Sequence, residues 1–162
     1  MFAVLDDCLD HHPAVRHLAD QRCATVVADA FRFLADERYR LMAYVVMPSH
    51  HHWMFLPNDE YFAKQPIHVK HKRTPREQIS HSIQSYTSNE CNRILGLSGA
   101  FWLDETYDHY ARDDDEMFRI IQYIEQNPVK AGLVKQSEDW QWSSAYIRDQ
   151  LKLSPQDAIP PK

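Results

Sequence analysis

Three consecutive histidines, His50, His51 and His52, come two residues after an apolar run that spans residues 41–47. In a β-strand, successive side chains point to opposite faces, so His50 and His52 should share one face and His51 the other. Two neighbouring imidazoles can bind one metal ion, because each offers a nitrogen lone pair near neutral pH. Two ligands do not hold a divalent ion alone, so a third group is needed. The alternative is a partly exposed strand start, since a chain with ten histidines forms such clusters by chance.

A second pair of polar residues, Tyr123 and Asn127, lies in a segment with helical periodicity. On a helical wheel, one apolar arc contains Met117, Ile120, Ile121 and Ile124. Tyr123 and Asn127 are four positions apart and therefore lie together on one edge of the helix, beside that arc. Both could reach a site formed where this helix crosses a sheet. The alternative is a boundary tyrosine with its hydroxyl in water and an asparagine that closes the helix before Pro128.

Other common catalytic patterns are missing from the sequence. The chain has only three glycines and no glycine-rich phosphate loop, and it contains neither GxSxG nor HExxH. The acidic run at residues 113–116 is typical of a helix N-terminus, where negative charge is favourable. Cys91 has no local partner that would make it a nucleophile. The His and Tyr–Asn pairs are therefore the main candidates for chemistry.

Length and composition predict a single domain over residues 1–162, with residues 147–162 as a tail. An apolar fraction of 44% with 25% charged residues is ordinary for a globular protein. No stretch has the apolar length of a membrane span, and the N-terminus has no signal-peptide pattern. The three cysteines are widely spaced and form no CxxC pair, which favours reduced thiols. We therefore expect a cytoplasmic protein without a membrane partner.

Charge is distributed unevenly along the chain. The formal net charge of −5 counts against nucleic-acid binding by bulk electrostatics. Residues 64–76, however, contain five cations and no acid, whereas residues 104–116 are strongly acidic. The basic segment could follow a phosphate backbone, and its candidate DNA-binding residues are Lys70, Lys72, Arg73 and Arg76. The alternative is a solvated loop that happens to be basic.

Periodicity and turn residues predict a mixed α and β chain. A Thr-Pro-Arg-Glu sequence at residues 74–77 has the spacing of a capping box, and Gly96 is a plausible end of the helix that it opens. Pro128 should stop the helix that carries Tyr123. In chain order we expect a helix over 13–36, a hairpin of strands 39–47 and 50–56, a loop over 57–73, a helix over 75–95, a strand within 101–111, a helix over 113–127, a packing segment at 140–146 and a frayed C-terminus.

Taken together, these motifs resemble the REP-associated tyrosine transposases of the HUH single-strand transposase superfamily. The similarity spans roughly residues 39–146 and follows the family's order. It is carried by Met-Pro-Ser-His-His-His at 47–52, Phe-Trp at 101–102, Tyr-Ile-Glu-Gln-Asn-Pro-Val-Lys-Ala-Gly-Leu at 123–133 and Trp-Gln-Trp-Ser-Ser-Ala at 140–145. The tyrosine-helix stretch is highly specific, whereas a His-x-His pair alone is not.

The resemblance implies a ferredoxin-like α+β domain, in which helices flank an antiparallel sheet. It also implies metal-dependent cleavage and joining of single-stranded or hairpin DNA, by a monomer or a homodimer. Matched residue by residue, His50 and His52 correspond to the metal-binding pair and Tyr123 to the nucleophile. Asn127 corresponds to the polar residue that completes the metal site for Mg²⁺ or Mn²⁺.

This chain departs from the family pattern at four places. Ser49 replaces a frequent Asn, and His51 occupies a middle position that is usually apolar. Gln84 stands where many relatives have a Lys, and residues 1–12 do not read as the strand with which relatives begin.

These departures keep two other functions open. One is a domesticated module that binds hairpin DNA without cutting it, and the other is a phosphodiesterase that hydrolyses through water. A covalent adduct at Tyr123 separates the transposase reaction from both.

Overall fold

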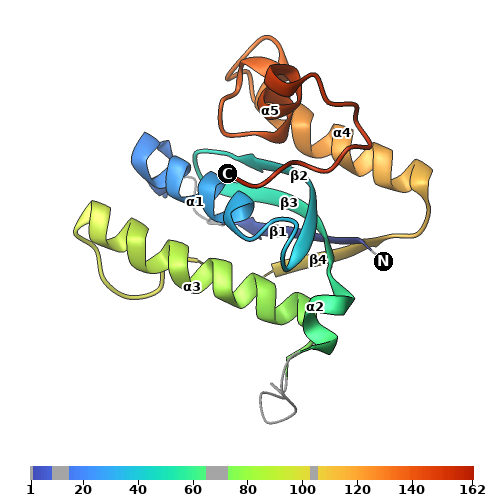
Figure 1. Ribbon diagram of the computed structural model, residues 1–162. Coiled ribbons are helices and arrows are strands. Elements are labelled where there is room, and N and C mark those ends of the chain that lie inside the picture. The colour runs from blue at the N-terminus through green and yellow to red at the C-terminus, as the bar shows by residue number, and fades with distance from the viewer. Residues whose placement is uncertain (1, 9–14, 65–72, 103–105) are drawn as a thin grey trace.

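Four strands form one antiparallel sheet in the order β2-β3-β1-β4 (Figure 1). The strands are β1 (Phe2–Cys8), β2 (Tyr39–Val46), β3 (His50–Pro57) and β4 (Thr106–Ala111). The helices are η1 (His17–Ala19), α1 (Gln21–Phe33), α2 (Asp59–Ala63), α3 (Pro75–Leu95), α4 (Asp114–Lys130), η3 (Ser137–Asp139) and α5 (Ser144–Leu151). This strand order, with helices between the strands, is the ferredoxin-like α+β arrangement that the resemblance implied.

The computed structural model describes residues 2–8, 15–64, 73–102 and 106–162. It describes side chains for residues 15–64, 73–102 and 111–162.

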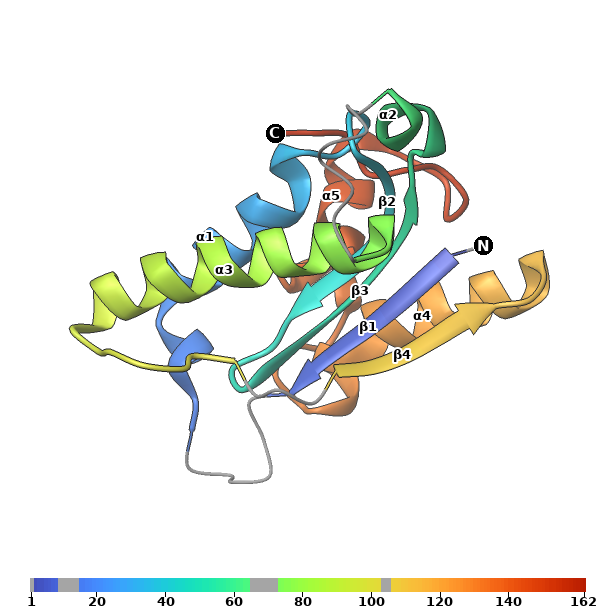
Figure 2. The same cartoon turned by 90° about the horizontal axis from the view of Figure 1, so that it is seen from below.

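Helices cover both faces of the sheet. Helices α1 and α3 lie on one face, and α4 and α5 lie on the other (Figures 1 and 2). The core is divided in the same way. One buried cluster joins the aromatic side of the sheet to α1 and α3, and a second joins the methionine-rich side to α4. The tyrosine helix predicted from the sequence is α4, and it packs on the face of the sheet opposite α1 and α3.

The β2–β3 hairpin is the part of the sheet that the sequence predicted best. The two strands pair from Tyr39 opposite Pro57 to Val46 opposite His51. A register irregularity between Leu41 and Ala43 interrupts the ladder. A bulge of this kind shifts which residues of the strand face each side of the sheet. Leu41 therefore joins the α1–α3 core, and Ala43 joins the α4 core.

A strand at the N-terminus corrects the expectation that residues 1–12 do not form one. β1 lies in the middle of the sheet, where it pairs with β3 on one side and β4 on the other. Asp6, for example, is opposite His52 in β3 and Tyr107 in β4. Backbone hydrogen bonds on both edges form with segments that are remote in sequence, so local periodicity does not reveal them. The strand next to the His pair is therefore present.

The helices of the first half of the chain begin at recognisable caps. The helix expected over 13–36 is shorter, because Asp20 caps α1 by accepting a hydrogen bond from the Arg22 N–H at 2.9 Å. The capping box is confirmed: Thr74 Oγ1 accepts from the Glu77 N–H, and the Glu77 carboxylate accepts from the Thr74 N–H at 2.6 Å. Gly96 ends α3 with a φ of 66°, a left-handed conformation that suits glycine.

Two connecting segments differ from expectation. The loop expected over 57–73 contains helix α2, which Asn58 caps by accepting from the backbone of Glu60 and Tyr61. The strand expected within 101–111 begins only at Thr106. Trp102, before that strand, is buried, and its indole N–H donates to Thr87 Oγ1 at 2.9 Å. A tryptophan whose one donor is satisfied in the core explains the aromatic signal there without a strand.

The expectation of a frayed C-terminus is wrong. Ile159 is completely buried, and its N–H donates to the Leu41 carbonyl at 2.8 Å. Arg32 on α1 donates from Nε to the Pro160 carbonyl and from Nη2 to the Pro161 carbonyl. The last residues therefore pack along the edge strand β2, where they cover part of an otherwise unpaired edge.

Candidate active site

His50 and His52 begin β3 on the face that α4 covers. Their ring centroids are 4.9 Å apart, with the rings at 74° to each other. His52 is buried, whereas His50 is half-buried. The Ser49 hydroxyl lies 3.1 Å from Nδ1 of His50. The expected alternation thus places two imidazoles side by side, and the half-buried ring lies next to a hydroxyl that can orient it.

His51 points to the opposite face, as a strand requires. Its ring lies 5.1 Å from that of Phe31 and 4.7 Å from that of Trp102, and the residue is 2% exposed. An imidazole is planar and aromatic, so it packs among these rings much as an apolar aromatic residue would. The departure from the family pattern at this position is therefore accommodated in the α1–α3 core and leaves the His50–His52 face unchanged.

Tyr123 on α4 lies next to the histidine pair. Its ring centroid is 5.7 Å from that of His52, and the residue is 47% exposed. Met117, Ile121 and Ile124 of α4 pack into the second core, and this packing turns the Tyr123 edge of the helix toward the start of β3. The structure therefore brings the predicted nucleophile and the predicted metal ligands together, while Tyr123 stays accessible to a substrate.

Asn127 occupies the same edge of α4, one turn after Tyr123. Its side-chain Nδ2 donates to the Tyr123 carbonyl at 2.7 Å and to the Ile124 carbonyl at 3.4 Å. The second bond has a clear cause. Pro128 has no N–H, so it cannot donate to the carbonyl of Ile124 four residues earlier, and the Asn127 amide takes that acceptor instead. With Nδ2 engaged by the helix, Oδ1 is the atom of Asn127 that can face a ligand.

Because the Asn127 amide replaces the missing Pro128 N–H, α4 does not end where the sequence predicted. We expected Pro128 to stop α4 at Asn127, but the helix continues to Lys130 with Pro128 buried inside it. Gly132, with a φ of 69°, then ends the helical segment in a left-handed turn. The extension adds nearly one turn to the edge that carries Tyr123.

Lys130 belongs to the site only because of that extension. Its Nζ lies over the Tyr123 ring, 4.7 Å from the centroid. This is a cation–π arrangement, in which the ammonium is attracted to the negative face of the ring. Sequence reasoning missed Lys130, because a helix that ends at Asn127 does not include it. The signal that could have found it is its spacing of seven residues, two helical turns, from Tyr123.

The donor set fits a divalent cation. His50 and His52 offer imidazole nitrogens, and the Asn127 carboxamide offers an oxygen, a combination compatible with Mn²⁺ or with Mg²⁺ that retains water ligands. Across the described part of the chain, no three His, Cys, Asp or Glu side chains lie close enough together to bind a metal ion on their own, so the amide of Asn127 is the third ligand considered. A site with two imidazoles and one amide would leave positions for oxygens of a substrate.

A buried arginine connects α4 to the C-terminal part of the chain. Arg148 on α5 is 6% exposed, and its Nε donates to Glu125 Oε1 at 2.9 Å. Nη1 donates at 2.7 Å to the carbonyls of Ser154 and Asp157, and Nη2 donates to the Met42 carbonyl of β2. Because Glu125 is two residues from Tyr123, this arginine links the position of the tyrosine helix to the edge of the sheet.

Ser144 adds a second link at the same place. Its hydroxyl accepts from the Tyr44 N–H at 3.1 Å and lies 2.5 Å from Glu125 Oε1. Together, Glu125, Ser144 and Arg148 form a buried polar network between α4, α5 and β2. We call these three residues the Glu–Ser–Arg network.

The predicted DNA-binding cations that the structure describes, Arg73 and Arg76, are not next to the histidine pair. Lys70 and Lys72 lie outside the described residues. Arg73 is exposed and Arg76 half-buried, at the start of α3. Helix α3 covers the sheet face opposite α4, so these two arginines and Tyr123 belong to different sides of the molecule (Figure 1).

The two cysteines whose side chains the structure describes are poorly placed for chemistry. Cys23 and Cys91 are free and completely buried, and the Cys91 Sγ lies 3.9 Å from the Cys23 carbonyl. Burial raises the pKa of both thiols, which suppresses the reactive thiolate.

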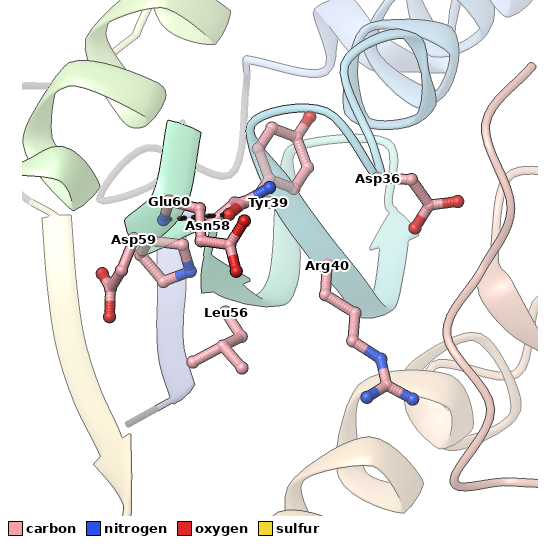
Figure 3. A pocket seen from close by; sticks show the side chains of 8 residues that line it. Asp36, Tyr39, Arg40, Leu56, Asn58, Asp59 and Glu60 are labelled. Atoms are coloured by element: carbon pink, nitrogen blue, oxygen red, sulfur yellow. Dashed lines mark hydrogen bonds between the residues drawn. The ribbon is translucent and has the colours of Figure 1, made fainter. Parts of the chain in front are cut away.

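A separate pocket lies at the other end of the β2–β3 hairpin. It has a volume of about 370 Å³, and the side chains around it come from both strands and from the start of α2 (Figure 3). Its walls include Asp36, Arg40, Leu56 and Asp59. None of the predicted site residues that the structure describes lines it.

Searches against known proteins identify relatives of one kind, although no family profile matches the chain. A provisionally named REP-associated tyrosine transposase of Haemophilus influenzae is 27% identical over 121 residues, which are 74% of this chain and 66% of that protein. A REP-associated tyrosine transposase of Escherichia coli is 28% identical over 111 residues, which are 67% of this chain and 56% of that protein. The chain thus matches between half and two thirds of the length of these relatives.

A solved structure shares the fold. It is described as a REP-associated tyrosine transposase bound to a REP hairpin, and it superposes with a TM-score of 0.61 at 21% identity. The superposition covers 96% of this chain and 82% of the other. Within the described residues, no helix has both the length and the apolar character needed to cross a bilayer. In sequence, this protein is similar to the REP-associated tyrosine transposases, and its fold is that of the solved structure.

Proposed function

We propose that this protein is a metal-dependent endonuclease and strand transferase for single-stranded DNA, with hairpin DNA of the REP type as its substrate. The observation that carries the proposal is the contact between the ring of Tyr123 and that of His52. It brings a solvent-accessible phenol next to a pair of imidazoles that could bind a metal ion. The names of the two relatives and the DNA hairpin in the related structure support the choice of substrate.

Each candidate residue has a separate role in the proposed reaction. His50, His52 and the Oδ1 of Asn127 would hold a Mg²⁺ or Mn²⁺ ion, which when bound withdraws charge from the phosphate oxygens. Tyr123 Oη attacks phosphorus, so that a tyrosine–phosphate bond forms and the bond to the 3′ oxygen breaks. The phenol loses its proton, and the departing 3′ oxygen gains one.

The covalent product explains how strands could be joined again. The DNA is left with a 5′-phosphate attached to Tyr123 and a free 3′-hydroxyl. Because the phosphodiester energy is retained in the tyrosine linkage, a second 3′-hydroxyl can reverse the reaction without ATP. Exposure of Tyr123 to solvent is compatible with the entry of a DNA strand.

The structure weakens the case for a binding module that does not cut. Two of the departures that motivated it, the unusual N-terminus and His51, are explained by strand β1 and by packing of the imidazole between Phe31 and Trp102. Gln84, half-buried on α3, remains the main departure from the family pattern.

The test is a denaturing gel with a labelled hairpin that carries a single-stranded flank. In the presence of Mn²⁺, the wild-type protein should give an SDS-resistant protein–DNA band. Tyr123→Phe should abolish the band, whereas Tyr86→Phe, at an exposed tyrosine on α3, should leave it unchanged. His50→Ala and His52→Ala should lose the band as well, with His81→Ala, at an exposed histidine, as their control.

The outcomes separate the three functions. Cleaved DNA without an adduct, undiminished in Tyr123→Phe, indicates hydrolysis through water. Salt-sensitive hairpin binding that survives His50→Ala, with no adduct in any metal, indicates a binding module. Titration of Mn²⁺ into the wild-type protein and His52→Ala tests the metal site independently of cleavage.

A further inference from the structure

We propose that Lys130 is a catalytic residue of the cleavage step, whose ammonium contacts the non-bridging oxygens of the phosphate that Tyr123 attacks. This inference rests on the proposed function of Tyr123. Lys130 would be a second positive group in the site besides the proposed metal ion, and it is supplied by the protein chain itself.

The ammonium of Lys130 lies close to the proposed nucleophile. Nζ of Lys130 lies 4.7 Å from the centroid of the Tyr123 ring, although the two residues are two helical turns apart. The side chain therefore runs back along α4 toward the nucleophile. A lysine at a helix C-terminus can satisfy the helix dipole without this orientation, because any position near the last carbonyls would do so.

The positive charge of Lys130 is available to a ligand. Lys130 is exposed, and within the described residues no carboxylate lies at ion-pair distance from it. The nearest acid in sequence on α4 is Glu125, whose Oε1 is held by Arg148 and Ser144. The ammonium is thus available to an anion, and among the described side chains its one recorded contact is with the ring of Tyr123.

Lys130 lies on the same edge of α4 as the other proposed site residues of that helix. Tyr123, Asn127 and Lys130 occupy positions i, i+4 and i+7 of α4, which form one stripe. A phosphate within reach of Tyr123 Oη would lie next to this stripe. The cation that His50 and His52 would hold lies on the sheet side of the phosphate and Lys130 on the helix side, so positive charge would reach the phosphate from two directions.

The expected chemistry is electrostatic. During attack, negative charge accumulates on the non-bridging oxygens of the phosphate and on the departing 3′ oxygen, and an ammonium next to the non-bridging oxygens stabilises the charge there. Lys130 keeps its proton throughout. The bond between the tyrosine oxygen and phosphorus forms and the bond to the 3′ oxygen breaks, while the phenol gives its proton to solvent and the departing 3′ oxygen takes one from solvent.

The experiment measures adduct formation in single turnover at saturating hairpin DNA with Mn²⁺, together with the Kd for the same hairpin. Lys130→Met should slow the step roughly 10²-fold, in the range found when one stabilising donor is removed from an active site. The Kd should change much less than the rate. Lys130→Arg should restore most of the rate, because it retains the charge.

Lys135→Met is the matched control, since Lys135 is also exposed and the change in net charge is the same. Its rate should equal that of the wild type, and the Tm of both methionine variants should be unchanged. If Lys130→Met forms the adduct at the wild-type rate, or if both variants slow equally, Lys130 has no catalytic role while the proposed function stands. If the wild-type protein forms no adduct, both proposals fail together.

Discussion

The ring of Tyr123 and the ring of His52 meet within one chain, with their centroids 5.7 Å apart. This contact joins the third strand in the sequence to the helix that follows the fourth. The packing of α4 against β2, together with the Glu–Ser–Arg network, holds the two in place. A complete set of candidate catalytic groups is therefore present in each molecule.

The intramolecular contact predicts that one chain is sufficient for the reaction. Mixing Tyr123→Phe with His52→Ala should restore no adduct at any ratio, because neither molecule contains both groups. The measurement is the SDS-resistant band across a titration of one variant into the other. Recovery toward a quarter or a half of the wild-type signal would show that molecules exchange α4.

Asn127 has two separable roles, and a double variant distinguishes them. In Asn127→Ala, the Ile124 carbonyl loses its side-chain donor, and the free energy of unfolding should fall by about 0.5–1.5 kcal/mol. Adding Pro128→Ala supplies a backbone N–H to that carbonyl and removes a proline from the helix interior, so stability should recover. Urea unfolding monitors this recovery.

Adduct formation should respond differently. Both the single and the double variant lack the amide oxygen proposed as a metal ligand, so both should remain inactive in Mn²⁺. An active double variant would mean that Asn127 serves only the helix.

Arg148 should be the most sensitive charged residue in the fold. Arg148→Met leaves the Glu125 carboxylate buried without its partner, which typically costs about 3–5 kcal/mol of unfolding free energy. The matched control is Arg93→Met, which breaks an ion pair to Glu90 with an arginine side chain that is 72% exposed. That change should cost less than about 1 kcal/mol. Similar midpoints of urea unfolding for the two variants would contradict a structural role of the Glu–Ser–Arg network.

Asp20 should contribute to stability in a pH-dependent way. Hydrogen bonds from the Arg22 side chain and backbone lower the pKa of Asp20 from 3.8 to about 2. Because the pKa is lower in the folded state, the stabilisation is complete above the unfolded value near 3.8 and is lost as the pH falls through about 2.

Asp20→Ala should therefore lower the Tm at pH 7, and its difference from the wild type should shrink between pH 4 and pH 2. Asp20→Asn keeps a capping oxygen and should lose less at pH 7. Circular dichroism melts at pH 7, 4 and 2 provide the comparison. A gap between wild type and Asp20→Ala that stays constant down to pH 2 would exclude the carboxylate as its origin.

The C-terminal segment should behave as part of the core. Ile159→Ala removes a completely buried side chain and should cost about 2–5 kcal/mol of unfolding free energy. Leu151→Ala, at a residue that is 51% exposed, should change stability by about 0.5 kcal/mol or less. Equal effects in denaturant unfolding would mean that the last residues do not pack against Leu41 in solution.

Local features of the fold were predictable because their causes are local. Alternation along a strand placed His50 and His52 on one face and His51 on the other, and the capping box placed the start of α3 at Pro75. The spacing of four residues put Tyr123 and Asn127 on one helix edge. Each of these relations depends only on the geometry of a single element.

Features that depend on remote partners were not predictable in the same way. β1 owes its place to pairing with β3 and β4, and Ile159 is buried because β2 offers its edge. The end of α4 depended on whether Asn127 would replace the missing Pro128 donor, which a residue pattern alone does not reveal.

The sequence by itself therefore determined the chemical groups, the elements that carry them and the face on which each lies. The tertiary structure decided that β3 and α4 meet with His52 against Tyr123, and that Lys130 joins them. The physical reason is that periodicity orients a side chain relative to its own backbone, whereas the distance between two elements is determined by the packing of the core between them.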